Sequence, residues 1–200
     1  MITIGLTGGI ASGKSTVLHL LEELGAIIVD SDKLAHKAME PNTPGWQDII
    51  KTFGSEILNP DMTINRKRLG DIVFNDHKLL FKLNEVIHPR VAEKFKDIIS
   101  EVRKSYTDNS VIVIEIPLLY ETRMERLCDE VWVVWVDEAT QIKRLMEREG
   151  ISKADAINRI KSQMPIDEKA KRADFVINNM QTMEETREVT TKYFNEMLHN

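Results

Sequence analysis

The segment GLTGGIASGKST, residues 5–16, combines glycines, a lysine and hydroxyl side chains at a spacing that suits phosphate binding. It contains the complete pattern G-x-x-x-x-G-K-[ST], from Gly8 to Ser15. In such a loop the backbone N–H groups turn inward toward phosphate oxygens, the lysine reaches the β- and γ-phosphates, and the hydroxyl ligates Mg²⁺. The sequence therefore predicts a nucleoside triphosphate site, with Lys14 on the phosphates and Ser15 on the metal ion.

The position of this loop supports the same prediction. It follows an apolar strand and opens a helix, whose positive N-terminal end favours anions, so a chance glycine turn is the weaker alternative. Thr16 is expected to support the start of the helix. The predicted nucleotide-binding residues of the loop are Gly8, Gly9, Ile10, Ala11, Ser12, Gly13, Lys14, Ser15 and Thr16.

Two carboxylates follow the second predicted strand, in the run Asp30-Ser31-Asp32. Ligands of open α/β folds bind at the carboxyl ends of the strands, where a carboxylate can orient an acceptor hydroxyl and take its proton. Asp32 is therefore a candidate catalytic base, and capping of the next helix is an equally good reading. Glu115, at the end of another apolar run, is a candidate for holding Mg²⁺ through water, although a salt bridge would serve equally well.

Arginines in the segment ATQIKRLMERE, residues 139–149, could act on the transferred phosphoryl group. Arg144 and Arg148 are four residues apart and share one helix face, where guanidinium groups can neutralise phosphate charge. We take Arg144 as a catalytic candidate and Arg148 as a nucleotide contact. A solvated helix with Glu147 and Glu149 as partners is the alternative, and it is the better reading of either arginine taken alone.

Three further residues carry weaker signals. His88-Pro89 is expected to end one helical run and start another, because proline suits the first turn of a helix. Cys128 is the only cysteine, so it forms no internal disulfide, and we expect a small buried hydrophobe in a reducing, cytoplasmic protein.

Five short apolar runs rich in β-branched residues predict buried strands. They are residues 2–7, 26–30, 111–117, 131–137 and 174–178. Helical patterns at three- and four-residue spacing cover residues 14–24, 139–149 and 181–199. Continuous apolarity suits a parallel sheet covered on both faces, so the alternation predicts an α/β, doubly wound fold.

Two insertions interrupt this alternation within what we expect to be a single domain of 200 residues. Residues 31–109 predict a mainly helical lobe. Residues 149–172 are charged and contain Gly150 and Pro165, which is typical of a lid that moves.

The composition narrows the classes of partner. The net charge is −5, from 27 Lys and Arg against 32 Asp and Glu, which argues against nucleic acid as the main partner. No apolar run reaches the length of a membrane span, and the first residues are expected to form a strand rather than a signal peptide. A small phosphorylated ligand in a local basic pocket fits this balance.

In this order the motifs resemble the dephospho-coenzyme A kinase family, and the likeness covers nearly the whole chain. The motifs are GLTGGIASGKS (5–15), DSD (30–32), VF…IHPRV (73–91), IPLLYE (116–121), QIKRLMER (141–148), RIKSQ (159–163) and ADFVINN (173–179). The loop alone is shared by many nucleotide-binding proteins, whereas the ordered combination is specific.

The resemblance implies ATP-dependent phosphorylation of the ribose 3′-hydroxyl of dephospho-coenzyme A, which yields coenzyme A and ADP. It implies a P-loop kinase core with a five-stranded parallel sheet, a helical lobe that binds the coenzyme A substrate, and a lid. By resemblance Asp32 is the base and Arg144 the phosphate-binding arginine. Thr7, Lys14 and Ser15 become contacts of ATP and Mg²⁺.

Three positions depart from the family pattern. Ala11 stands where glycine is common, and its small side chain fits if the backbone φ there is negative. Met62 replaces a usual glycine in the turn 59–62, and the segment 178–180 lacks the usual glycine after the last strand, near the expected adenine pocket.

Two other functions remain open from the residues. A kinase of nucleosides or nucleoside monophosphates would use the same core and differ in its acceptor. A regulatory nucleotide-binding protein without turnover would tolerate Asp32→Asn, whereas a kinase would lose most of its turnover.

Overall fold

The structure, a computed structural model, describes residues 1–74, 76–105 and 110–199. Within these ranges it describes all side chains except those of Asp32, Phe74, His77, Leu80, Arg103 and His199. The chain forms two compact units: unit 1 comprises Met1–Asp30 and Arg103–Asn200, and unit 2 comprises Ser31–Val102.

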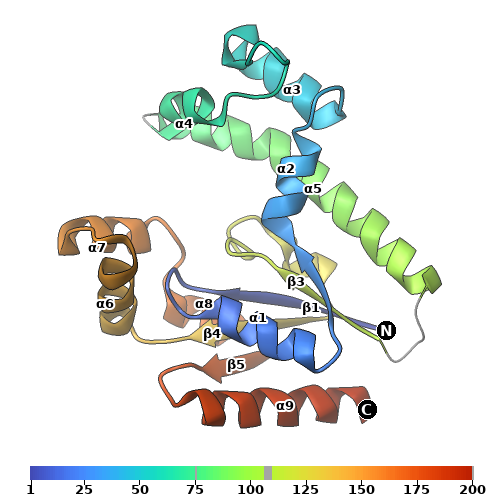
Figure 1. Ribbon diagram of the computed structural model, residues 1–200, viewed down its shortest axis with the longest axis vertical. Helices are drawn as coiled ribbons and strands as arrows, with labels where there is room; N and C mark the ends of the chain where they lie inside the picture. Colours follow the sequence, from blue (N-terminus) through green and yellow to red (C-terminus); the bar gives the residue numbers. More distant parts are fainter. Residues whose placement is uncertain (75, 106–109, 200) are drawn as a thin grey trace. The chain divides into compact units, whose positions relative to one another are not determined.

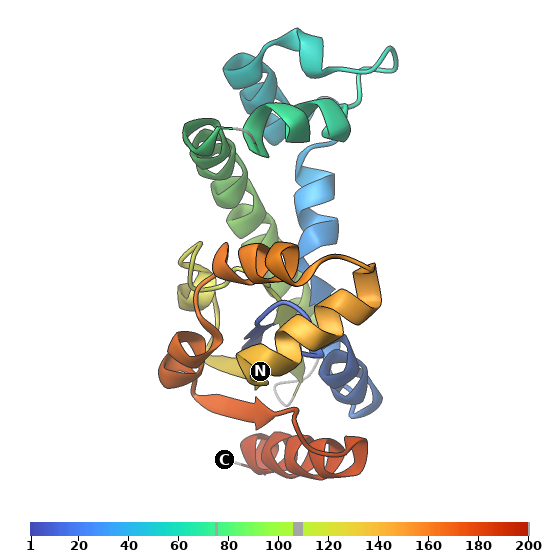
Figure 2. The same cartoon turned by 90° about the vertical axis from the view of Figure 1, so that its left-hand side faces the viewer.

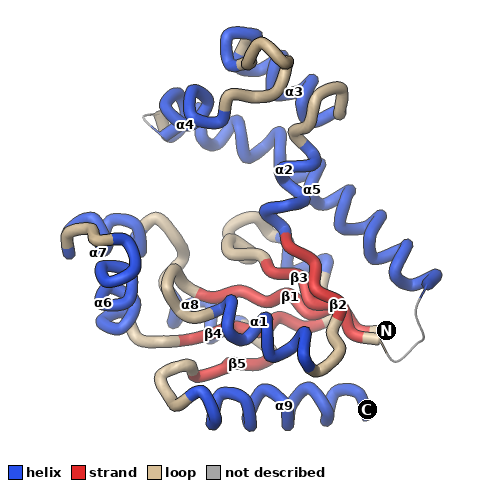
Figure 3. The backbone as a smooth tube through the Cα atoms, viewed as in Figure 1, coloured by secondary structure: helices blue, strands red, loops and turns tan. Residues whose placement is uncertain are grey.

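Unit 1 is built on one parallel sheet (Figure 3). Its strands are β1 (Ile2–Gly8), β2 (Ile27–Asp30), β3 (Val111–Glu115), β4 (Glu130–Trp135) and β5 (Phe175–Asn178). They lie in the order β2-β3-β1-β4-β5, and every neighbouring pair is parallel. The predicted fold class is therefore confirmed, and the glycine-rich loop leaves the sheet from its central strand.

Helices α1 (Lys14–Glu23) and α9 (Met183–His199) pack together and cover one face of this sheet (Figure 1). Val17 and Leu21 of α1 lie in the same fully buried cluster as Ile4 and Leu6 of β1. Apolar residues at helical spacing thus meet the continuous apolar strands that the sequence indicates, and their burial fixes the start of α1 beside the end of β1.

The other face is covered by the segment after β3, with η2 (Met124–Leu127), and by α8 (Ile166–Arg172), which packs against β4. Lys169 of α8 is fully buried, and its Nζ donates to the Pro117 carbonyl at 2.8 Å and lies 2.9 Å from Glu121 Oε1. Burial lowers the pKa of Lys169, and the hydrogen bond to Glu121 opposes that shift. A buried ammonium needs such partners, so α8 is firmly held to the loop after β3.

Two helices follow β4 before α8, namely α6 (Glu138–Glu149) and α7 (Lys153–Lys161). They contact each other across a short turn, as Figure 2 shows. Asp137 caps α6 by accepting from the Thr140 N–H at 2.7 Å, and Gly150 ends α6 in a left-handed conformation.

Unit 2 is helical. It contains α2 (Ser31–Ala38), α3 (Pro44–Phe53), η1 (Ser55–Ile57) and α4 (Arg66–Phe74), and α5 (His77–Ser105) runs from it into unit 1. Among its described residues the only β pairing is an isolated bridge between Leu58 and Ile64. A separate apolar cluster, which includes Ile49 and Leu69, forms its core.

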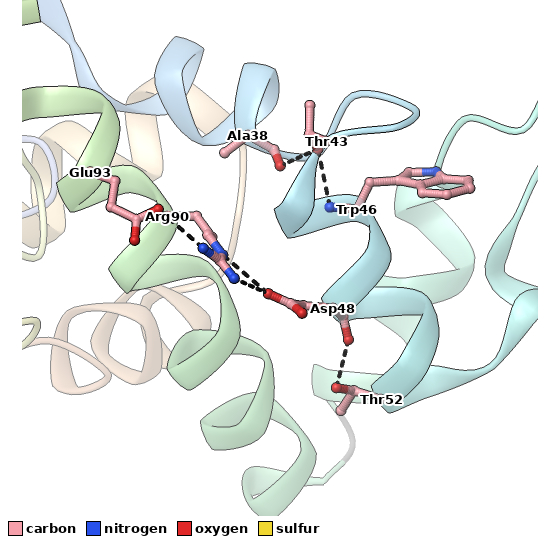
Figure 4. Close-up of polar contacts among 7 residues, drawn as sticks. All are labelled: Ala38, Thr43, Trp46, Asp48, Thr52, Arg90 and Glu93. Carbon is pink, nitrogen blue, oxygen red and sulfur yellow. Dashed lines mark hydrogen bonds and ion pairs between the residues drawn. The ribbon is translucent and has the colours of Figure 1, made fainter. Parts of the chain in front are cut away.

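Polar contacts fix α3 within unit 2 (Figure 4). The Thr43 hydroxyl accepts from the Trp46 N–H at 3.1 Å and so caps the helix. Arg90 of α5 donates from Nη2 and Nε to Asp48 Oδ2 at 2.7 and 3.1 Å, and from Nη1 to Glu93 at 3.1 Å. These contacts join α3 to α5.

The prediction that His88-Pro89 separates two helices is wrong, because α5 continues through Pro89. Proline lacks the N–H that would bond one turn back and disfavours a helix interior. Burial of neighbouring side chains, including Val86, Ile87 and Val91, offsets that cost. Tertiary packing has overridden a local signal.

We expect partial burial of His88 to make the stability of the protein sensitive to acid. Burial lowers the pKa of this imidazole from its ordinary value of 6.5. As the pH falls, the unfolded chain takes up the proton first, so stability is lost below about pH 6.5. We expect His88→Gln to weaken this loss when urea midpoints at about pH 7.5 and about pH 5.5 are compared. His19→Gln, at an exposed position of α1, is the control. An unchanged acid dependence in His88→Gln would contradict the prediction.

Candidate active site

The loop between β1 and α1 is held in a tight turn by hydrogen bonds within its own backbone. Gly13 has a φ of 92°, which favours glycine, and the Ser12 N–H donates to the Gly9 carbonyl at 3.2 Å. The Thr16 N–H donates to the Gly13 carbonyl at 3.1 Å and starts α1. The first N–H groups of α1 therefore face the loop, and the helix adds its positive end to this anion site.

The side chains of the loop suit a phosphate ligand. Lys14 Nζ donates to the Gly9 carbonyl at 3.3 Å, which keeps its charge over the loop. Ser15 is exposed at the start of α1. Ser12 is fully buried, and its hydroxyl has no hydrogen-bond partner within the described part of the chain. A buried polar group without a partner is uncommon, and phosphate oxygens would supply acceptors for it.

The structure corrects the expectation about Ala11. Its φ is +58°, so the negative φ that would let alanine replace glycine without strain is not present. Met62 in unit 2 has a φ of +66°. Both residues occupy the left-handed region, which is unfavourable for residues that carry a Cβ atom.

The predicted acidic residues lie at the carboxyl ends of two neighbouring strands. Asp30 of β2 and Glu115 of β3 are register partners, and Glu115 is also the register partner of Leu6, just before the loop. Asp32 is the second residue of α2, which begins directly after β2, and its side chain lies outside the described part of the structure. Asp32 is thus inside the first turn of the helix rather than at the position before it.

Thr7 lies at the end of β1 and is fully buried. Its hydroxyl donates to the Pro117 carbonyl at 3.2 Å, the carbonyl that also accepts from Lys169. Thr7 therefore joins the loop to the segment after β3 and, through it, to α8.

The two arginines of α6 have different surroundings. Arg144 is half-buried, donates from Nη2 to the Asn179 carbonyl at 3.1 Å, and places Nη1 beside Gly13. Arg148 is exposed and forms an ion pair with Glu149 at 2.7 Å. Arg159 of α7 also pairs with Glu149, so the structure brings Arg144 to the loop and gives Arg148 a carboxylate partner.

Two residues that contact the loop were not predicted as site residues. The side-chain amide of Gln141 donates to the Ile10 carbonyl, and that of Asn179 donates to the Ser12 carbonyl. Gln141 lies three residues before Arg144 and thus near it on α6, a spacing that the sequence already displays. Asn179 has no comparable local signal, because it is brought to the loop by the pairing of β4 with β5.

Two further kinds of feature would bear on function, a metal site built from protein side chains and a helix that crosses a membrane. Within residues 1–74, 76–105 and 110–199, no three His, Cys, Asp or Glu side chains gather as a metal site. The helices described there include none with the length and apolarity required to cross a bilayer.

Comparison with known proteins assigns the family. A family model described as dephospho-CoA kinase matches residues 2–185. The chain belongs to the dephospho-CoA kinase family. A dephospho-CoA kinase from Carboxydothermus hydrogenoformans is 49% identical over 185 residues, which cover 92% of this chain and 89% of that relative. The family catalyses the final, ATP-dependent step of coenzyme A biosynthesis, so the activity class expected from the sequence is confirmed.

Solved structures agree with this assignment. A dephospho-CoA kinase from Campylobacter jejuni superimposes with a TM-score of 0.74 at 32% identity, over 98% of this chain and 97% of that one. A Thermus thermophilus protein superimposes with a TM-score of 0.79 at 31% identity, with the same coverage. Both matches extend over nearly the whole length, so the fold of the sheet and of the helical insertion is shared.

The strain at Ala11 can be tested by Ala11→Gly. Glycine relieves a left-handed conformation that costs an L-residue about 1–2 kcal/mol, while it adds about 0.4–1 kcal/mol of unfolded-state entropy. We expect the free energy of unfolding, measured in urea, to rise by roughly 0.5–1 kcal/mol. Ala92→Gly within α5 is the matched control and should lower it by about 1 kcal/mol. Equal destabilisation by both changes would show that Ala11 is unstrained.

Proposed function

We propose that this chain transfers the γ-phosphoryl group of ATP to the ribose 3′-hydroxyl of dephospho-coenzyme A and releases coenzyme A and ADP. The observation that carries the proposal is a complete phosphate-binding loop between β1 and α1, in a chain that matches the dephospho-CoA kinase family over residues 2–185. Phosphoryl transfer needs little covalent chemistry from the protein, so positioning and charge are its main contributions.

The loop holds the triphosphate in this proposal. Its N–H groups and the start of α1 bind the phosphate oxygens, and Lys14 neutralises charge on the β- and γ-phosphates. Arg144, half-buried beside Gly13, adds a second positive charge next to the loop. Because these charges act in a partly buried site, they stabilise the transferred group more strongly than exposed charges would.

Asp32 supplies the base on the acceptor side. It follows the carboxyl end of β2, the edge at which open α/β folds bind their ligands. A carboxylate at this position orients the 3′-hydroxyl and accepts its proton as the bond to phosphorus forms.

Oxygen ligands near the loop fit a bound Mg²⁺. The Ser15 hydroxyl would ligate the ion directly, and the carboxylates of Asp30 and Glu115 would hold its water shell. Mg²⁺ keeps several waters and binds through few protein ligands together with substrate phosphates, which agrees with this sparse set. When bound, Mg²⁺ neutralises the phosphate charge that develops during transfer.

Residues 149–172 form the lid in this proposal, and the anchoring of Lys169 narrows the part that moves. Lys169 and Ile166 of α8 are buried in unit 1, whereas α7 is mainly exposed. The segment that closes over the site is therefore α7 and its flanking turns. Closure when the acceptor is present keeps water from the γ-phosphate. The reducing cytoplasm is the proposed location, since the lone Cys128 forms no internal disulfide.

The acceptor is the first thing to test. We expect Mg·ATP-dependent ADP release with dephospho-coenzyme A, with coenzyme A identified by mass, and background release with AMP, UMP, thymidylate or uridine. Turnover only with a nucleotide or nucleoside would show that the acceptor is not dephospho-coenzyme A. It would not contradict the proposed role of the loop in binding the triphosphate. A chain that binds ADP and turns over none of these acceptors would be a nucleotide-binding protein.

Asp32→Asn separates binding from catalysis. Loss of the general base should lower kcat at least about 100-fold, because proton transfer by a positioned side chain contributes that much. ADP affinity measured by calorimetry should be unchanged, because the loop does not depend on Asp32. Asp97→Asn, an exposed carboxylate on α5, is the matched control. A kcat for Asp32→Asn within about twofold of wild type would remove Asp32 from the mechanism.

A further inference from the structure

Two side-chain amides donate hydrogen bonds to backbone carbonyls of the phosphate-binding loop. Gln141 Nε2, from α6, donates to the Ile10 carbonyl at 2.7 Å. Asn179 Nδ2, from the residue after β5, donates to the Ser12 carbonyl at 2.8 Å. The two residues are far apart in sequence and reach carbonyls that lie two residues apart in one loop, so their contacts are made by tertiary structure.

Both amides occupy space that the glycines of the loop leave open. A Cβ atom on Gly9 would lie 2.0 Å from Gln141 Nε2, and one on Gly13 would lie 2.1 Å from Asn179 Nδ2. Gln141 is only 1% exposed, so its amide has no room to turn to solvent. Besides providing conformational freedom, the two glycines therefore leave space for the donor nitrogens of Gln141 and Asn179.

The orientation of Asn179 is fixed from several sides. Its backbone N–H donates to the Trp135 carbonyl of β4 at 2.8 Å. Its Oδ1 accepts from the hydroxyl of the buried Thr186 at 3.3 Å, which leaves Nδ2 for Ser12. Its carbonyl accepts from Arg144, so one residue joins the loop, the sheet, α9 and the candidate catalytic arginine.

Peptide geometry connects these contacts with anion binding. In a planar trans peptide the carbonyl of one residue and the N–H of the next point in opposite directions. The bonds from Ile10 to Ala11 and from Ser12 to Gly13 are trans. A donor that holds the Ile10 carbonyl therefore points the Ala11 N–H away from Gln141, and a donor on the Ser12 carbonyl points the Gly13 N–H away from Asn179.

We propose that Gln141 and Asn179 are positioning residues that hold the loop in its anion-binding shape before the nucleotide arrives. The proposal rests on the proposed function, since it concerns the triphosphate site of that reaction. In it the two amides do not touch ATP. They set the direction of two N–H groups that do, so their removal lowers the fraction of loops competent to bind phosphate.

The test measures ADP and inorganic tripolyphosphate binding by calorimetry for Gln141→Met and Asn179→Leu, which remove the donors and keep similar side-chain size. Each change leaves a carbonyl without its donor, and we expect affinity for both probes to fall about tenfold. The KM for ATP should rise, whereas the affinity for dephospho-coenzyme A should stay at the wild-type value. A loss of stability alone would not separate the two substrates in this way.

Exposed residues of the same types provide matched controls. Gln181→Met and, on α9, Asn195→Leu alter exposed side chains and should retain wild-type ADP affinity. If Gln141→Met does not fold, Gln141→Ala makes the same comparison, because its shorter side chain cannot collide with Gly9. Wild-type affinity in both donor variants would overturn the positioning role alone. Failure of the wild-type chain to bind ADP would instead overturn the proposed function, and the positioning role with it.

Discussion

In the proposed triphosphate site, backbone N–H groups must converge on one anion, and the rest of unit 1 is arranged to meet this constraint. Each peptide that turns its N–H inward turns a carbonyl outward, and that carbonyl needs a donor. The loop supplies one itself, since the Gly9 carbonyl accepts from Ser12 and Lys14, and the start of α1 supplies another at Gly13. The carbonyls of Ile10 and Ser12 receive their donors from the side chains of Gln141 and Asn179. A site made of backbone therefore requires side chains from distant elements.

The strand order places complementary charges on opposite sides of this loop. β1 lies between β3 and β4, so the carboxyl end of β3 brings Glu115, and that of β2 brings Asp30, to one side. On the other side β4 leads into α6, which carries Arg144. Parallel strands align all their carboxyl ends at one edge, so a site of mixed charge can form there from residues that are far apart in sequence.

The sequence predicts the sheet well because the strands are continuous apolar runs whose burial decides their conformation. Ile4, Ile114 and Val133 are fully buried within their strands, and the loop motif lies between a strand and a helix as the pattern requires. Local signals fail where tertiary packing decides. Pro89 lies inside α5 rather than between helices. Ala11 adopts a positive φ, which the residue types next to it in the sequence do not predict. The contact of Asn179 with Ser12 depends on the pairing of β5 with β4, which no local spacing records.

The sparse set of metal ligands has a consequence for the order of binding. Among the described residues no group of three acidic, histidine or cysteine side chains could hold a metal ion, so the protein alone offers Mg²⁺ few ligands. Mg²⁺ gives up water reluctantly, and phosphate oxygens supply the ligands that such a site lacks. In the proposed reaction the ion and the triphosphate therefore enter as one unit, and the loop that orients the phosphates also determines where the ion lies. In this proposal the backbone conformation of residues 8–15 thus determines the position of both the triphosphate and its metal ion.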